Sequence, residues 1–298
     1  MWSRPAWSSA PSPASLADPL PHAPPEWAEA AEHICRHAPA RVLVIGARDA
    51  GKSTFCRFLA DAAPQLGRSA ALLDTDVGQK TIGPPACVTL QDRHGMRFAF
   101  VGTTDPVLGW RPLVEGARRL AHEADADLLV VNTSGLLGGP GRRLKAAKID
   151  AVRPDLLIAL GDDPAVRKIL DDHPDHPALR LPLSPEARRK TNGERRAVRR
   201  EAFRAYFVQG SVLALDKEML APLEPDAPFP PGLLVGLAGR DGNDLGLGLL
   251  TGCGHGPKLS VLSPVAEAEI CRIAQGFLCL DQTFSEAKPQ GTSGCGMG

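Results

Sequence analysis

Residues 41–54 read Arg-Val-Leu-Val-Ile-Gly-Ala-Arg-Asp-Ala-Gly-Lys-Ser-Thr. The apolar run Arg41–Ile45 ends at a glycine and predicts a strand that is buried on both faces, as in a parallel sheet. The part from Gly46 to Thr54 matches the pattern Gly-x4-Gly-Lys-[Ser/Thr], and helical spacing follows over Ser53–Ala62. A strand, a glycine-rich turn and a helix in this order indicate a P-loop, which binds nucleotide phosphates. An accidental glycine-rich turn is the alternative interpretation.

Each residue type in this turn has a physical task in binding ATP. Glycines let backbone N–H groups point inward around the β-phosphate, and the following helix directs its positive dipole end at the same anion. We expect Lys52 to bridge the β- and γ-phosphates, Ser53 to ligate Mg²⁺ through its hydroxyl oxygen, and Thr54 to contact the α-phosphate. The residues assigned to ATP binding in this turn are Gly46, Asp49, Ala50, Gly51, Lys52, Ser53 and Thr54.

Further apolar runs alternate with segments of helical spacing along the chain. Strands are predicted at 69–73, 97–101, 127–131 and 155–160, and helices at 26–37, 113–124 and 142–152. This alternation indicates an α/β fold with a doubly wound parallel sheet. After Gly210 the pattern changes to short strand-like runs separated by glycines, at 211–215, 233–237, 245–250 and 259–262. We therefore expect a small β-rich C-terminal domain.

Composition excludes several classes of protein. Lys and Arg together number 34, as do Asp and Glu, so the formal net charge is +0 and does not fit a protein that coats nucleic acid indiscriminately. The seven cysteines include no Cys-x-x-Cys pair, which argues against a disulfide framework or a zinc site. No run of about 18 apolar residues occurs, so no membrane-spanning helix is predicted. These features favour a protein of the reducing cytoplasm.

A P-loop alone does not distinguish a kinase from a switch GTPase or a motor. Guanine recognition usually needs an Asn-Lys-x-Asp element, and none of the three asparagines is followed by Lys. The second predicted strand leads into Asp74-Thr-Asp76. Because the carboxyl ends of parallel strands form one edge, a carboxylate here could accept a proton from an attacking hydroxyl and help to hold Mg²⁺. A turn or a helix cap after the strand is an equally open interpretation.

Four segments follow one another in an ordered series. They are Gly46–Thr54, Asp74-x-Asp76-x-Gly78-Gln79, Phe100-Val-Gly102 with Pro106, and Val131-Asn132-Thr133-x-Gly135. Over residues 40–210 the chain thereby resembles the polynucleotide 5′-hydroxyl kinase family, which includes RNA kinases of mRNA 3′-end cleavage, tRNA splicing and pre-ribosomal RNA processing. The resemblance implies transfer of the γ-phosphate of ATP to the 5′-hydroxyl of RNA or DNA.

The resemblance also implies roles for single residues. By the resemblance Asp76 is expected to be the general base, whereas Asp74 occupies a position that varies in the family. Of the two carboxylates after the strand, Asp76 is therefore also the one assigned to Mg²⁺. Gly78 and Gln79 are expected to bind the substrate, with Gln79 in contact with either the nucleotide or the acceptor strand. Thr133 and Gly135 match a loop that clasps the nucleotide, although Leu136 stands where many members have Trp.

Residues 186–204 concentrate basic side chains: Arg188, Arg189, Lys190, Arg195, Arg196, Arg199, Arg200 and Arg204. Arg196, Arg200 and Arg204 share one face of a predicted helix. Val198, Ala202 and Tyr206 are expected to form an apolar stripe on another face. A solvated helix face is the general interpretation of such a run.

The resemblance instead implies an arginine-bearing lid that closes over ATP just before Tyr206-Phe207. Arg189, Lys190 and Arg195 are the candidates for stabilising charge on the transferred phosphoryl group. Arg199 and Arg200 are candidates for binding the backbone of the acceptor strand, because guanidinium groups suit phosphate.

The sequence is divided into four parts. Residues 1–25 are expected to be a flexible tail, and residues 287–298 are expected to be a disordered tail. Residues 26–209 are predicted to form a P-loop kinase domain with the lid at about 185–205, and residues 210–286 the β-rich C-terminal domain. No role is assigned to Cys253-Gly-His255. The basic residues Arg142, Arg143, Lys145 and Lys148 are interpreted as a solvated helix face, with a track for a polynucleotide as the alternative.

The sequence therefore predicts a polynucleotide 5′-hydroxyl kinase that uses ATP and Mg²⁺ and acts on 5′-OH ends of RNA or DNA, with no membrane partner. A catalytically silent ATP-binding scaffold of an RNA-processing complex and a P-loop ATPase switch are the alternatives. Motif spacing leaves open the choice between RNA and DNA and the oligomeric state.

Overall fold

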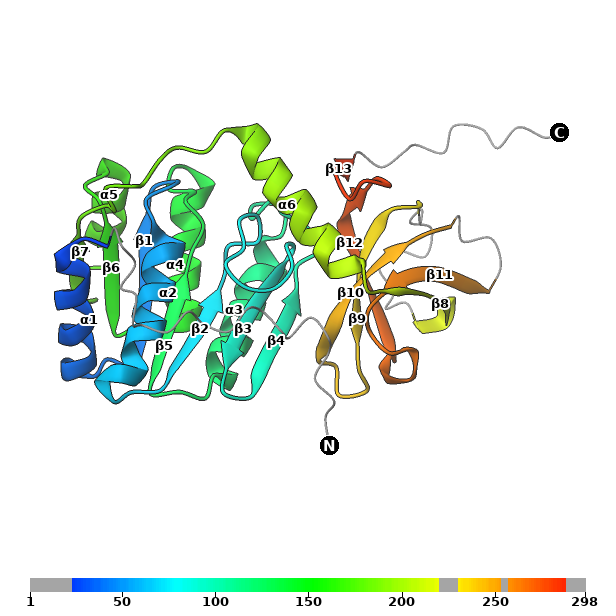
Figure 1. Cartoon of the computed structure of the whole chain (residues 1–298), viewed down its shortest axis with the longest axis horizontal. Coiled ribbons are helices and arrows are strands. Elements are labelled where there is room, and N and C mark those ends of the chain that lie inside the picture. The colour runs from blue at the N-terminus through cyan, green and yellow to red at the C-terminus, as the bar shows by residue number, and fades with distance from the viewer. Residues whose placement is uncertain (1–22, 220–229, 253–256, 288–298) are drawn as a thin grey trace.

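Strands and helices alternate in the first two thirds of the chain, and strands with few helices follow (Figure 1). The computed structural model describes residues 23–219, 230–252 and 257–287. Cys253, His255 and all but the inner ends of the two predicted tails lie outside these residues. Among the described residues, thirteen strands belong to one sheet, so the predicted P-loop and C-terminal parts share a continuous sheet.

Five parallel strands form one half of this sheet, here called the parallel half. In spatial order they are β2 (Ala70–Asp74), β5 (Leu128–Asn132), β1 (Arg41–Gly46), β6 (Leu156–Leu160) and β7 (Ala178–Leu181). The strands predicted at 41–45, 69–73, 127–131 and 155–160 are confirmed to within one residue at each end. Because β1 lies between β5 and β6, the P-loop that follows it opens at the centre of the carboxyl edge.

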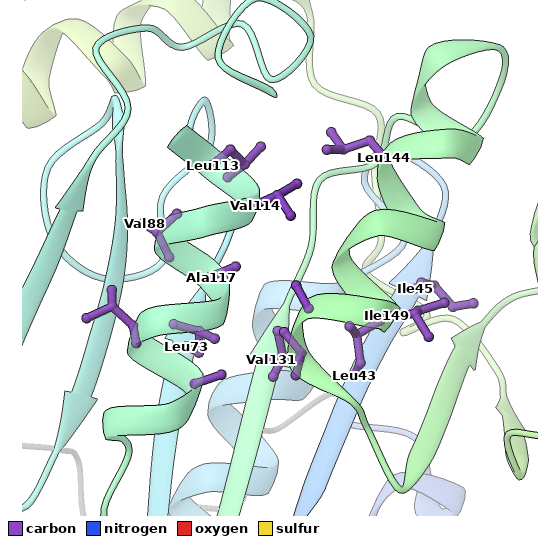
Figure 2. Close-up of a cluster of buried hydrophobic side chains, with 14 of the residues drawn as sticks. Leu43, Ile45, Leu73, Val88, Leu113, Val114, Ala117, Val131, Leu144 and Ile149 are labelled. Carbon is purple, nitrogen blue, oxygen red and sulfur yellow. The ribbon is translucent and has the colours of Figure 1, made fainter. Parts of the chain in front are cut away.

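Helices cover both faces of the parallel half. On one face, α1 (Pro25–His37) and α2 (Lys52–Ala62) pack on the side chains of Val42 and Val44. On the other, α3 (Trp110–Glu123), α4 (Pro140–Val152) and α5 (Pro164–Asp171) form one buried cluster with Leu43 and Ile45. Figure 2 shows the part of this cluster that comes from α3, α4 and the strands. Successive residues of β1 thus enter opposite cores, which explains its uninterrupted apolar sequence. The doubly wound α/β architecture is confirmed.

The strand predicted at 97–101 exists but has a different orientation from the parallel strands. It is β4 (Gly95–Phe100), which pairs antiparallel with β3 (Cys87–Asp92). Only residues 93 and 94 separate the two strands, and a link of two residues allows a hairpin but no crossover. β3 in turn pairs antiparallel with β2. The sheet therefore changes direction at this boundary.

The remaining strands continue the sheet beyond β4 and, with β3 and β4, form its antiparallel half. They are β8 (Ser211–Asp216), β9 (Leu233–Ala238), β10 (Asp244–Leu250), β11 (Lys258–Ser263), β12 (Arg272–Leu280) and β13 (Glu286–Ala287). β10 meets β4 at one register pair, Asp244 opposite Phe98. Asp244 strengthens this narrow junction by accepting a hydrogen bond from the backbone of Phe100 at 3.1 Å and pairing with Arg119 at 3.2 Å.

Helix α6 (Asn192–Phe207) connects the two halves (Figure 1). Its C-terminal turn is buried in a cluster with strands β9 and β10, and the Tyr206 hydroxyl accepts a hydrogen bond from the backbone of Leu247 at 2.8 Å. The predicted apolar stripe is wrong at its start, because Val198 is 48% exposed and only the last turn meets the sheet. Arg196, Arg200 and Arg204 are exposed, as predicted for the cationic face.

Candidate active site

The P-loop lies between β1 and α2. Gly51 precedes the helix with a φ of 81°, a conformation that a residue with a side chain adopts at a cost. Lys52 folds back over the loop, and its Nζ donates a hydrogen bond to the carbonyl oxygen of Ala47 at 2.6 Å. Burial lowers the pKa of Lys52, while the carboxylate of Asp76 opposes this change more than any other neighbouring charge. The ammonium and that carboxylate are thus electrostatic neighbours.

Asp74 ends β2 and is completely buried in a network of donors. It accepts hydrogen bonds from the backbone of Thr81 at 2.5 Å and of Asp76 at 3.0 Å, and Lys80 Nζ lies 3.4 Å from its carboxylate. Its contacts fix the loop that follows the strand. Asp76 comes two residues later, where its Oδ1 accepts hydrogen bonds from the backbones of Gly78 and Gln79, both at 3.0 Å.

Asn132, at the end of β5, links this loop to the P-loop. Its Nδ2 donates to Asp74 Oδ1 at 3.0 Å, to Ser53 Oγ at 3.3 Å and to Thr81 Oγ1 at 3.3 Å. Asn132 was predicted only as part of a motif, with no role of its own. Its place at the carboxyl end of an apolar strand was the available signal.

The loop after β5 packs directly on the P-loop. The hydroxyl of Thr133 donates to the carbonyl oxygen of Val44 at 2.7 Å, so its side chain points into the protein. At Gly135 an added Cβ would lie 2.6 Å from backbone atoms of Arg48, which leaves room for no side chain. This close approach explains why residue 135, two positions after Thr133, is a glycine.

The interpretation of α4 as a solvated basic face is wrong for two of its lysines. Lys145 and Lys148 are both 0% exposed, whereas Arg142 is exposed and pairs with Asp172. Burial lowers the pKa of Lys148 to about 8, although Asp76 and Asp74 oppose this effect. The pKa of Lys145 is lowered well below its usual range by burial and by the charges of Lys148 and Lys52.

The start of α6 is tied to the P-loop. Asp49 Oδ2 accepts a hydrogen bond from the backbone of Lys190 at 3.0 Å and forms an ion pair with the guanidinium of Arg195. A capping box of Thr191 and Glu194 begins the helix at this place. Hydrogen bonds from the Thr191 backbone and from Arg188 lower the pKa of Glu194 to about 2.

One turn further along α6, Arg199 is held by the C-terminal strand β13. Its Nε and Nη2 each donate to the carboxylate of Glu286 at 2.7 Å. The same carboxylate accepts from the hydroxyl of Thr104 at 2.6 Å. Burial opposes ionisation of Glu286, yet these hydrogen bonds leave its pKa lowered. Glu286 was not identified from the sequence, where a lone acid near the C-terminus gives no signal.

These elements enclose a cavity of about 1120 Å³. The predicted site residues that line it are Asp49, Gly51, Lys52, Ser53, Thr54, Asp76, Gly78, Gln79, Gly135, Lys190, Arg195 and Arg199. Gly46, Ala50, Thr133, Arg189 and Arg200 were also predicted as site residues and are not among its lining residues. The loop after β4 also lines the cavity and forms a wall of it at residues 104–107.

The oxygens near the P-loop suit a hard cation. Ser53 supplies a hydroxyl whose orientation is held by Asn132, and Asp76 supplies a carboxylate in the same cavity. Mg²⁺ prefers such oxygens and completes its octahedron with phosphate and water. Within the described residues no cluster of three or more His, Cys, Asp or Glu side chains could hold a metal by itself. The donor set therefore fits Mg²⁺ bound together with a nucleotide.

Residues 46–209 match the family described as mRNA cleavage and polyadenylation factor CLP1 P-loop. This segment is more than half of the 298 residues. The chain belongs to this family. The resemblance inferred from the four ordered motifs is confirmed.

Curated relatives in the family are named polyribonucleotide 5′-hydroxyl-kinase. That of Pyrococcus horikoshii is 33% identical over 190 residues, covering 60% of this chain and 52% of the relative. That of Methanocaldococcus jannaschii is 32% identical over 189 residues, covering 58% and 52%. Clp1 of Xenopus tropicalis is 28% identical over 190 residues, covering 56% and 44%. The chain spans about half the length of the curated relatives it matches.

The fold extends the similarity beyond the P-loop segment. The solved structure of the wild-type Clp1p–Pcf11p (454–563) complex matches with a TM-score of 0.67 at 15% identity, covering 84% of this chain and 78% of that one. At this identity the match shows a shared fold, including the β-rich C-terminal strands. Among the described residues of the present chain, no helix has both the length and the apolar character needed to cross a membrane.

Proposed function

We propose that this chain transfers the γ-phosphate of ATP to the 5′-hydroxyl of a polynucleotide, with RNA as the acceptor that the names of its relatives favour. One observation carries the proposal: Lys52, Asp76 and Arg195 line the same cavity, at the end of a P-loop. A cation on the donor phosphates, a carboxylate on the acceptor and a guanidinium from a lid are the parts that phosphoryl transfer needs.

The cavity has room for both substrates. Its volume of about 1120 Å³ exceeds the roughly 300–1,000 Å³ of typical single-ligand pockets. In the proposed arrangement the triphosphate lies on the P-loop, and the acceptor end enters between Gln79 and the wall at residues 104–107. The lid at about 185–205 belongs to the P-loop part (26–209), and the C-terminal part (210–286) supports the lid through Glu286.

The proposed reaction is an in-line displacement. The 5′-hydroxyl oxygen attacks the γ-phosphorus while the bond from that phosphorus to the bridging oxygen of ADP breaks, and the hydroxyl proton passes to Asp76. Bound Mg²⁺ would neutralise charge on the phosphate oxygens, with Ser53 and Asp76 as the protein oxygens available to hold it. Lys52 and Arg195 stabilise the charge that develops on the transferred group.

The test uses radiolabelled ATP with matched RNA and DNA oligonucleotides that carry 5′-OH ends. We expect Mg²⁺-dependent label on the 5′ end of RNA, lost in Lys52→Ala and kept in the control Lys168→Ala, whose side chain is exposed on α5. ATP binding without label on either acceptor would instead favour the silent scaffold. Phosphate release that does not depend on an acceptor would favour an ATPase switch.

Two further expectations go with this function. One is the reducing cytoplasm as the proposed location. It fits the free thiols of the described residues, which are Cys35, Cys56, Cys87, Cys271 and Cys279. The solved complex with Pcf11p contains a protein of the same fold bound to a partner. We therefore propose a protein partner for this chain, whose binding would be detected independently of the labelling assay.

A further inference from the structure

Helix α4 presents two lysines to the interior, three residues apart. Lysine is almost never fully buried without compensation, because an ammonium group loses its hydration there. Lys145 and Lys148 are each 0% exposed. Residues three apart share one face of a helix, so both side chains point from α4 toward the carboxyl edge of the sheet. Each reaches a different loop of the candidate site.

Lys148 reaches the residue between the two aspartates. Its Nζ donates to the carbonyl oxygen of Thr75 at 2.8 Å and to the Thr75 hydroxyl at 3.0 Å. The Thr75 hydroxyl and backbone N–H donate in turn to the carbonyl oxygen of Asn132, at 2.7 and 3.0 Å. The carbonyl held by Lys148 belongs to the peptide that joins Thr75 to Asp76. Its orientation sets the direction in which Asp76 leaves the strand.

Lys145 reaches the loop that packs on the P-loop. Its Nζ donates to the carbonyl oxygen of Ser134 at 2.6 Å and to that of Leu136 at 3.3 Å. Gly135 lies between these two carbonyls and is the residue whose backbone abuts Arg48. One ammonium group therefore fixes both sides of the contact between this loop and the P-loop.

We propose that Lys148 and Lys145 are positioning residues: Lys148 aims the Asp76 carboxylate, and Lys145 holds the loop around Gly135 against the nucleotide-binding turn. This inference rests on the proposed kinase function and adds to it a separate role for each of the two lysines of α4. An apolar residue of similar length would fill the same space without a desolvation cost, so packing alone does not account for two ammonium groups.

The experiment measures kcat, KM for acceptor RNA, and the Kd of ATP in Lys148→Met and Lys145→Met. For Lys148→Met we expect kcat to fall about 100-fold while the Kd of ATP changes less than about threefold, because a small misplacement of a reacting group affects the chemical step. For Lys145→Met we expect the Kd of ATP to rise about 10-fold. Arg143→Met is the matched control on the exposed side of α4 and should leave all three values unchanged.

A double-mutant cycle separates positioning from general destabilisation. If Lys148 acts through Asp76, then Lys148→Met in an Asp76→Asn background should lower kcat by no more than about threefold. Full additivity of the two losses would overturn the inference, as would a wild-type kcat in the single variant. Should Lys148→Met fail to fold, Thr75→Val removes the hydroxyl from the same contact. It should lower kcat about 10-fold with ATP affinity kept, and a wild-type kcat there would equally overturn the inference.

The outcomes also distinguish this inference from the proposed function. If the wild-type chain labels no 5′-OH acceptor, the proposed function fails, and the role of Lys148 fails with it. The role of Lys145 is then still decided by ATP affinity in Lys145→Met and Arg143→Met. If the wild-type chain is an active kinase and both methionine variants match it, the function stands and the inference is wrong.

Discussion

The two halves of the sheet contribute to the site in different ways. In the parallel half, β1, β2 and β5 end at one edge and deliver Lys52, Asp76 and Asn132 within a few residues of each strand end. The antiparallel half contributes a wall at residues 104–107 and one anchor for the lid, Glu286. Strand ends thus supply the groups proposed for chemistry, and the antiparallel half acts on them through α6.

The largest expected effect tests whether the chemistry belongs to the parallel half. Asp76→Asn should lower kcat by about 10³-fold, since it removes the proposed base, and should change ATP affinity only a few-fold. Asp216→Asn is the control, because Asp216 is an exposed acid at the end of β8 in the antiparallel half. Steady-state labelling of 5′-OH RNA measures both. Equal losses in the two variants would break the comparison.

A smaller loss is expected where α6 meets the P-loop. Arg195→Gln should lower kcat about 10²-fold, because it removes a guanidinium from the proposed transition state. Arg196→Gln, one residue later on the exposed face, should remain near wild type. The same labelling assay decides. If Arg196→Gln fell as far as Arg195→Gln, the effect would come from total charge and not from the position of Arg195 in the cavity.

A still smaller loss of activity is expected when Glu286, the lid anchor in the antiparallel half, is replaced. Glu286→Gln is expected to lower kcat/KM about 10-fold. Arg199 would lose its ionic partner, and the lid would no longer be held to β13 by this ion pair. Glu267→Gln, an exposed acid in the same half, is the control. Activity within twofold of wild type in Glu286→Gln would mean that the two halves work independently.

The smallest expected effect concerns stability and Lys148. Its pKa is lowered to about 8 in the folded chain, so between pH 8 and about 10.5 the unfolded chain binds more protons. The free energy of unfolding of the wild type should therefore rise with pH relative to Lys148→Met, by about 1 kcal/mol from pH 8 to 9. Urea denaturation at each pH measures it. A difference that does not change with pH would contradict the lowered pKa of Lys148.

The P-loop and its surrounding strands could be predicted because their signals are local. The apolar run of β1 and the spacing of Gly46, Gly51 and Lys52 lie in one short segment. The antiparallel half was harder to predict. No strand was predicted at β3, so its hairpin with β4 was missed, and β10 comes from a distant part of the chain and joins β4 at one register pair. Pairing of such distant segments leaves little trace in a single sequence.

The support of the candidate site could not be predicted for a similar reason. Lys145 and Lys148 have the same spacing as charged residues on a solvated helix, and their burial depends on loops at Thr75 and Ser134. Arg199 and Glu286 are 87 residues apart in the chain. Sequence spacing indicated which side chains could act, whereas the partners that orient them follow only from the folded chain.

Helix α6 constrains how the length of this chain can vary. Arg195 and Arg199 lie one turn apart, about 6 Å along the helix axis, and each is bound to a different part of the protein. One residue inserted between them would rotate Arg199 by about 100° relative to Arg195, so both ion pairs could not persist. Insertions and deletions should therefore be selected against between these two arginines.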